Sequence, residues 1–156
     1  MRRREAAPHG GTLSAAVPLA WRLRAITAAA VIPPLLEVMS LARLERILRS
    51  IARVQLTSAP SDAASAWWVD HNLDRWPGPW RRTCLRRAAV LYYLLRSSGR
   101  AVELCIGVRR DEHGELLAHA WLLRDGALYV EPSTTTEVVS EYTMIARFPG
   151  SIAHTT

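Results

Sequence analysis

The sequence contains no lysine, and its twenty permanently basic residues are all arginine. This absence excludes mechanisms that need a side-chain amine, such as a Schiff-base lysine or the lysine of a phosphate-binding loop. Cysteine is also scarce, and two cysteines, Cys84 and Cys105, cannot build a disulfide framework. So few cysteines favour a reducing compartment, and we expect a cytoplasmic protein.

Long apolar runs are missing as well. The longest uncharged stretch after Arg24 covers residues 25–36, twelve residues against the ~20 that a membrane-spanning helix needs. Pro33 and Pro34 interrupt it, so we predict no membrane span. The basic residues 2–4 followed by a short apolar run also fit a signal peptide, and the alternative is a solvated tail followed by a helix.

The composition that remains is that of a globular domain. The chain has 156 residues, of which 49% are hydrophobic and 22% charged, enough for one hydrophobic core. The net charge of +6 is unevenly distributed, since residues 81–110 hold eight arginines and a single acid, Glu103. Such a basic middle attracts nucleic acid, a membrane surface or an acidic peptide, and composition does not choose among them.

The first half of the chain has helical periodicity. Leucine and isoleucine recur every three or four residues over 41–51, with arginines between them. Ser61 and Asp62 are good caps for a second helix over 63–69. The sequence Trp-Pro-Gly-Pro-Trp at 76–80 then predicts a rigid loop, because proline there disrupts both helix and central strand.

The second half predicts a buried helix followed by antiparallel strands. Apolar residues surround the helix that starts at Cys84 and runs to Leu95, so we expect burial on nearly all sides. Alternating apolar residues and intervening turn residues then predict three consecutive strands, over 102–108, 116–123 and 127–131. Helices followed by a meander of strands indicate an α+β fold.

We expect one domain overall. Residues 13–80 form its helical part, and residues 81–149 form the buried helix with its antiparallel sheet. Residues 1–12 and 150–156 are expected to be tails.

Cys84 is a candidate nucleophile. It follows Thr83, a plausible cap, at the start of the buried helix, where free amides and the helix dipole lower the pKa of a thiol. A thiolate attacks carbonyl carbon, so this environment suits covalent catalysis. The alternative is a structural cysteine of the core, which is how we interpret Cys105, in an alternating strand.

A nucleophile needs a base, and His119 lies within the second expected strand. Its role depends on whether a carboxylate faces it, and the candidate is Glu131 in the next strand. A two-residue type I′ turn at Asp125-Gly126 would point Glu131 away from His119, whereas a three-residue loop that includes Arg124 would place the two side by side. We favour the three-residue loop, because an unpartnered carboxylate on the other face would be costly to bury. Cys84, His119 and Glu131 then form a nucleophile, a base and an orienting carboxylate.

These residues resemble a known family. The similarity lies in the Cys-Leu-Arg-Arg sequence from Cys84 and its apolar helix, in Gly-Val-Arg from Gly107, in His-Ala-Trp from His119 and in Glu131-Pro132. In these motifs the chain resembles the leader peptidases of lasso peptide biosynthesis, which are transglutaminase-like, papain-related cysteine proteases. The resemblance covers about residues 35–149.

The resemblance implies an activity and roles for three residues. The enzyme would remove the leader from a ribosomally made precursor peptide, with Cys84 as nucleophile, His119 as base and Glu131 as the third member. The third residue of the family is often aspartate, and glutamate is one methylene longer. Neither a cofactor nor a metal ion is implied, and no metal-binding spacing of cysteine and histidine occurs.

The resemblance also implies partners. Many members carry a fused winged-helix domain that grips the leader, but the first sixty residues here show no strand alternation. We therefore expect a stand-alone protease that works with a separate leader-recognition protein. A separate ATP-using macrolactam synthetase then closes the ring, and it is a further possible partner.

Other functions remain open at this stage. The high proportion of arginine is compatible with a nucleic-acid-binding protein, although no base-reading motif occurs, so we expect no nucleic-acid partner. An interaction subunit with an inactive triad is a second alternative. Transfer of the acyl group to an amine, as in a transglutaminase, would use the same geometry as hydrolysis.

Overall fold

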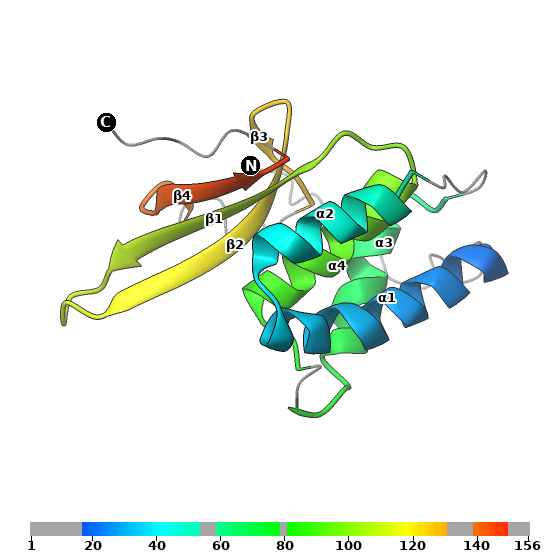
Figure 1. The fold of residues 1–156 in the computed structure, drawn as a ribbon, viewed down its shortest axis with the longest axis horizontal. Coiled ribbons are helices and arrows are strands. Elements are labelled where there is room, and N and C mark those ends of the chain that lie inside the picture. The colour runs from blue at the N-terminus through cyan, green and yellow to red at the C-terminus, as the bar shows by residue number, and fades with distance from the viewer. Residues whose placement is uncertain (1–16, 54–58, 79–80, 131–138, 150–156) are drawn as a thin grey trace, which may run out of the picture.

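The computed structural model describes residues 17–53, 59–78, 81–130 and 139–149. Helices come first along the chain and strands follow, which confirms the α+β fold, and the helices gather on one side of a small sheet (Figure 1). The helices are α1 (Leu19–Val38), α2 (Leu41–Ile51), α3 (Asp62–Leu73) and α4 (Cys84–Ser97). The strands are β1 (Glu103–Arg110), β2 (Leu116–Arg124), β3 (Ala127–Leu128) and β4 (Thr143–Phe148).

Helix α1 differs from the sequence-based expectation. It continues through Pro33 and Pro34, which we expected to interrupt it. Proline removes backbone donors and costs about 3 kcal/mol inside a helix, but Trp21, Ala25 and Ile32 on the same helix are buried in the main core. Their packing compensates for the lost hydrogen bonds.

The length of α1 also bears on the membrane. Its twenty residues have an 18-residue window of mean hydropathy 1.3, so the helix is long and apolar enough to cross a bilayer. Core helices of soluble proteins and signal sequences meet the same criterion, and a third of the window is buried inside the domain. Its buried face belongs to the same core cluster as α4.

Helix α4 forms the centre of the domain, as predicted. The Thr83 hydroxyl accepts a hydrogen bond from the Arg86 N–H at 3.3 Å, which fixes the first turn at Cys84. Residues 87–95 are all buried. The helix ends where Gly99 adopts a left-handed conformation (φ 80°), the geometry expected of a glycine after a helix.

The sheet contains a strand that the sequence analysis missed. Its order is β3-β2-β1-β4, so β4 returns to pair with β1 on the side opposite β2. All three pairings are antiparallel, and β1 and β2 are in a register that sets Gly107 opposite His119. The predicted hairpin of β1 and β2 is confirmed, and its turn projects away from the helices (Figure 1).

The two faces of this sheet have different neighbours. Leu104, Ala120 and Leu122 belong to the main core with α4. Cys105 and Trp121, on the alternate positions, form a smaller cluster on the other face. The catalytic candidate on β2 shares the face of this smaller cluster.

The turn between β2 and β3 corrects our choice of register. Arg124 pairs with Ala127, so the connection is the two-residue turn, and the expected three-residue loop is wrong. Asp125 (φ 52°) and Gly126 (φ 80°) are both left-handed, as a type I′ turn requires, and this turn matches the twist of the flanking strands. Strand β3 ends at Leu128 instead of continuing to Glu131. The ladder therefore does not set Glu131 opposite His119, and Glu131 itself lies outside the described residues.

Gly107 is a point of close approach on the face of His119. A Cβ atom there would lie 2.7 Å from Cη2 of Trp121 and 2.9 Å from Cβ of Tyr142. Both rings flank His119, so this glycine lets them close over the strand.

We predict that Gly107→Ala lowers the free energy of unfolding by about 1–3 kcal/mol, because the methyl group overpacks this face. The same change should reduce catalytic activity, since the displaced rings border His119. Gly114→Ala is the control, because nothing lies within 4 Å of that position and its cost comes only from a positive φ. Urea denaturation of both variants measures the difference, and equal losses would contradict the packing argument.

Candidate active site

Cys84 lies where the sequence analysis expected it, at the first residue of α4. Its side chain is half-buried and forms no disulfide. Thr83 caps the Arg86 N–H, which leaves the N–H groups of Cys84 and Leu85 without an acceptor inside the helix. Unpaired amides at the start of a helix can bind a developing oxyanion.

Cys105 is a core residue, as we expected. It is fully buried beside Trp121 and Leu123. Burial raises the pKa of its thiol to about 11, with smaller effects from the charges of Arg147 and Glu103. A thiol in this state does not ionise near neutral pH, so Cys84 remains the candidate nucleophile of the pair.

His119 lies among aromatic rings on β2. Its ring centroid is 6.0 Å from that of Trp121 and 5.5 Å from that of Tyr142. Burial lowers the pKa of His119, and the positive charge of Arg87 lowers it further. The imidazole is therefore neutral near pH 7, the form that accepts a proton. Its Nε2 is buried without a hydrogen-bond partner among the described residues.

Arg87 joins three elements at this site. Its Nε donates to Oδ1 of Asp70 on α3 at 2.6 Å, and its Nη2 donates to Oδ2 at 3.2 Å. The same Nη2 donates to the carbonyl of Val130, beyond β3, at 2.9 Å. Arg87 is one turn along α4 from Cys84, and its charge acts on His119. Arg87 therefore connects α3, α4 and the chain after β3 by hydrogen bonds, and its charge also acts on the His119 ring on β2.

Val130 has an unusual backbone. Its φ of 51° is left-handed, which is strained for a β-branched residue and costs about 1–3 kcal/mol. The hydrogen bond from Arg87 holds the Val130 carbonyl, and Val130 immediately precedes Glu131. Arg87 thus fixes the chain at the residue before the expected third member.

These contacts of Arg87 were not predicted from the sequence. An arginine in an otherwise apolar helix needs a partner, which was the available signal. Neither Asp70 nor the Val130 carbonyl could be recognised as that partner from the sequence. No hydrogen bond among the described residues joins Cys84 to His119 directly.

The basic middle of the chain is largely neutralised inside the fold. Of its arginines, five form ion pairs with acids elsewhere: Arg82 with Asp74, Arg86 with Glu37, Arg87 with Asp70, Arg100 with Asp62 and Arg109 with Glu141. These pairs link α4 and β1 to α1, to α3 and to the segment before β4. Most of the arginines in residues 81–110 therefore form ion pairs within the fold.

An open apolar pocket adjoins the site. It has a volume of about 360 Å³, and its walls include the two rings that flank His119. The residues that line it are Trp121, Leu123, Gly126, Leu128, Val139, Ser140, Tyr142 and Met144. Its size and lining suit an apolar side chain of a substrate. Among the described residues, no group of three histidine, cysteine or acidic side chains is placed to hold a metal ion.

We predict that the two cysteines differ in reactivity. Near neutral pH, iodoacetamide should alkylate Cys84 at least about tenfold faster than Cys105, because Cys84 is partly exposed whereas Cys105 is fully buried and burial raises the pKa of its thiol. Peptide mapping by mass spectrometry measures both rates in one sample. Faster labelling of Cys105 would contradict the assignment.

We also predict a low pKa for His119. A ¹³C or ¹⁵N NMR titration should give a midpoint below the ordinary 6.5. The free energy of unfolding should then fall as the pH drops below about 6.5, because the folded state resists protonation of this ring. Arg87→Met should raise the midpoint toward 6.5, since it removes one of the two causes. Asp70 keeps an ion pair with Arg82 in that variant. An unchanged midpoint would show that Arg87 does not act on the ring.

Comparison with known proteins identifies the family of the chain. Searches of curated proteins and of solved structures found no match to the chain. A family model described as the transglutaminase-like superfamily matches residues 13–147, which include all four helices and nearly all of the sheet. Because this match covers most of the chain, the protein belongs to the transglutaminase-like superfamily.

Proposed function

We propose that this protein is a cysteine peptidase that removes the leader from a ribosomally made lasso precursor peptide. The superfamily includes cysteine proteases and acyltransferases, so its membership supports the thiol chemistry. The narrower proposal comes from the resemblance of the motifs around Cys84, Gly107, His119 and Glu131. Within it, Cys84 is the nucleophile, His119 the base and Glu131 the orienting carboxylate.

The catalytic cycle has two steps. Neutral His119 accepts the proton of the Cys84 thiol, and the thiolate attacks the carbonyl carbon of the scissile amide. The resulting oxyanion is bound by N–H groups at the start of α4. Protonated His119 gives its proton to the leaving amine, which departs and leaves a thioester on Cys84. Water then attacks the thioester while His119 accepts a proton, and the acid product and the thiolate are released.

The observation that carries this proposal is the position of Arg87. Its hydrogen bond to the Val130 carbonyl holds the residue before Glu131 against α4, one turn from Cys84. Its charge also favours neutral His119, the form that the second step needs. These two contacts support a shared site for the segments that carry the three proposed members.

The proposed substrate and partners follow from the same function. The leader of the precursor peptide would be presented by a separate leader-recognition protein, as the resemblance to leader peptidases implies. The freed core peptide would pass to a macrolactam synthetase that acts as a separate enzyme. We propose no nucleic-acid partner and a cytoplasmic location.

Acyl transfer to an amine is the second candidate function. It shares the first step, and the acceptor alone differs. The apolar pocket beside His119 favours neither acceptor, so the products must decide.

The test is cleavage of a lasso precursor peptide, with its leader-recognition protein, by the wild-type enzyme and by Cys84→Ala. We predict that cleavage falls at least about 10³-fold in Cys84→Ala, because the nucleophile is lost. Cys105→Ala is the matched control and should keep the wild-type rate. In H₂¹⁸O the new carboxylate should carry ¹⁸O. A new amide formed with an added primary amine, without ¹⁸O, would identify a transferase, and equal cleavage by Cys84→Ala would remove the nucleophile assignment.

A further inference from the structure

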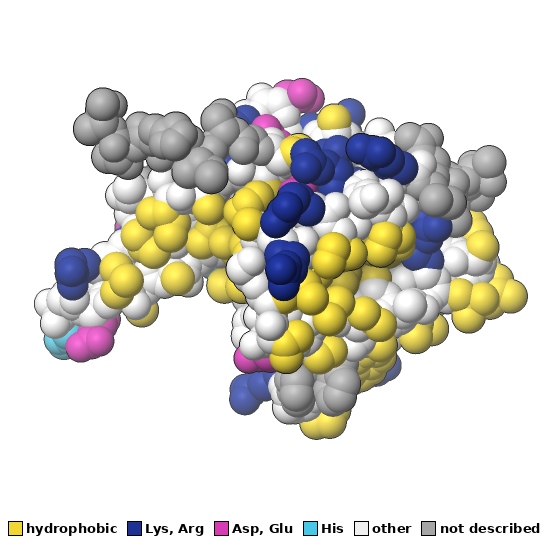
Figure 2. Space-filling view, in the orientation of Figure 1, with side chains coloured by type: hydrophobic (Ala, Val, Ile, Leu, Met, Phe, Trp, Pro, Cys, Tyr) yellow, Lys and Arg dark blue, Asp and Glu magenta, His cyan; other side chains and the backbone are white. Residues whose placement is uncertain are grey.

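The exposed face of α2 carries arginines without acids. Three of them are exposed, namely Arg43, Arg46 and Arg53, and Arg53 lies just past the last turn of the helix. The fourth, Arg49, is half-buried. Figure 2 shows a row of basic side chains on this side of the molecule. Glu45 is the one acid of α2; it is 3% exposed and turns inward, where it accepts a hydrogen bond from the Tyr92 hydroxyl at 2.7 Å. The charged side chains on the outer face of α2 are therefore all basic.

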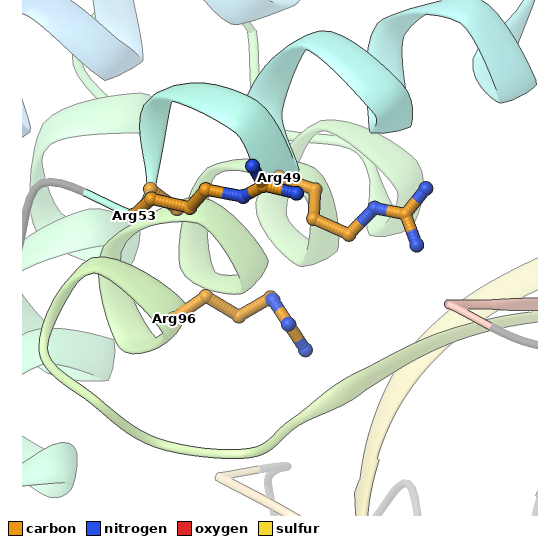
Figure 3. A pocket seen from close by; sticks show the side chains of 4 residues that line it. Arg49, Arg53 and Arg96 are labelled. Carbon is orange, nitrogen blue, oxygen red and sulfur yellow. The ribbon is translucent and has the colours of Figure 1, made fainter.

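A hollow opens between the ends of two helices beside this row. Arg49, Arg53 and Arg96 line it with Ala52, and its volume is about 260 Å³ (Figure 3). Arg49 and Arg53 come from the end of α2, and Arg96 comes from the last turn of α4. A hollow of this size accepts a carboxylate group with the first part of its side chain.

The charges around the hollow are only partly neutralised. Arg49 lies 3.5 Å from the Glu45 carboxylate. Arg96 donates to the Val102 carbonyl at 3.2 Å and lies over the Tyr92 ring, and neither contact cancels its charge. Arg53 forms no ion pair with any residue that the structure describes. This differs from the middle of the chain, where most arginines are paired with acids.

Aliphatic side chains border the arginines. Ile47 and Ile51 are one turn apart on α2, and they are 38% and 49% exposed. Figure 2 shows hydrophobic side chains directly beside the basic row. Phosphate or a nucleic-acid backbone makes no use of exposed isoleucine, whereas a peptide with acidic and aliphatic residues uses both surfaces.

This surface is remote from the candidate active site yet within the reach of a peptide. Cys84 and Arg96 are twelve residues apart on α4, which corresponds to about 18 Å along the helix axis. An extended peptide of about six residues spans that distance. One substrate chain can therefore contact both ends of α4.

We propose that the hollow lined by Arg49, Arg53 and Arg96, with the neighbouring Ile47 and Ile51, binds an acidic segment of the precursor peptide at a distance from the cleaved bond. Each carboxylate of the segment accepts charge-assisted hydrogen bonds from a guanidinium, and an aliphatic side chain packs on the isoleucines. This inference rests on the proposed function for the identity of its ligand. It makes the hollow a second substrate-binding site.

Binding can be measured without catalysis, using the Cys84→Ala protein. The probe is a fluorescein-labelled synthetic peptide of alternating glutamate and leucine, and its counterpart has glutamine in place of glutamate. We expect fluorescence anisotropy to show binding of the acidic peptide, weakening as salt is raised, and no binding of the glutamine peptide.

The variants locate the site. Arg53→Glu should weaken binding at least about tenfold, because it replaces an attractive charge with a repulsive one. Arg110→Glu changes the net charge by the same amount at the far end of the β1–β2 hairpin and should have no effect (Figure 1). Arg53→Gln with Arg96→Gln should also weaken binding, and thermal unfolding verifies that this double variant folds. Ile47→Ser should weaken binding by less.

Three results would overturn the inference. They are equal binding by Arg53→Glu and the parent, equal loss in Arg110→Glu, and displacement of the peptide by inorganic phosphate or duplex DNA as effectively as by unlabelled peptide.

Because the parent protein lacks the nucleophile, binding is independent of cleavage. If the acidic peptide binds but the wild-type enzyme cleaves no precursor, the proposed function fails and the site remains. If a precursor is cleaved but Arg53→Glu leaves its KM unchanged, the site fails and the function remains.

Discussion

The active-site end of this domain depends on one buried guanidinium. Arg87 lies in the most buried helix of the fold, where an unpaired charge would cost several kcal/mol. It is stabilised by the carboxylate of Asp70 on one side and the carbonyl of Val130 on the other. The ion pair and the hydrogen bonds of this one side chain therefore hold α3, α4 and the chain after β3 together. The same charge favours the neutral form of His119, so a structural requirement and a chemical one are met by a single group.

Helix α4 connects the two parts of the proposed function. Its first residue, Cys84, has free amides at its position and a half-buried thiol, which suits attack on a carbonyl. Its last turn places Arg96 beside the basic end of α2, which suits capture of a carboxylate. Burial of the helix between these ends makes it rigid, so the separation of about 18 Å is fixed. A peptide held at one end is thereby aligned toward the other.

The parts of the structure that depend on local sequence were predictable. The start of α4 follows from Thr83 as a cap, and the β1–β2 hairpin follows from alternation. The continuation of α1 through Pro33 was not predictable, because packing against other helices overrides a local cost. Asp125-Gly126 is compatible with two loop lengths. The twist of the paired strands decides between them, and these two residues alone do not determine that twist. Strand β4 and the partners of Arg87 depend on contacts between distant segments, which one sequence does not reveal.

The proposed mechanism requires the Cys84 thiol, at the start of α4, to reach the His119 ring on β2. Treatment with 1,3-dibromoacetone tests it directly, since this reagent loses two bromides and joins two nucleophiles through a three-carbon bridge. The account predicts one crosslinked species, in which peptide mapping finds Cys84 bonded to His119, and no such species in His119→Ala. Alkylation of Cys84 with the second bromide hydrolysed, or a bridge from Cys84 to any other residue, would contradict it.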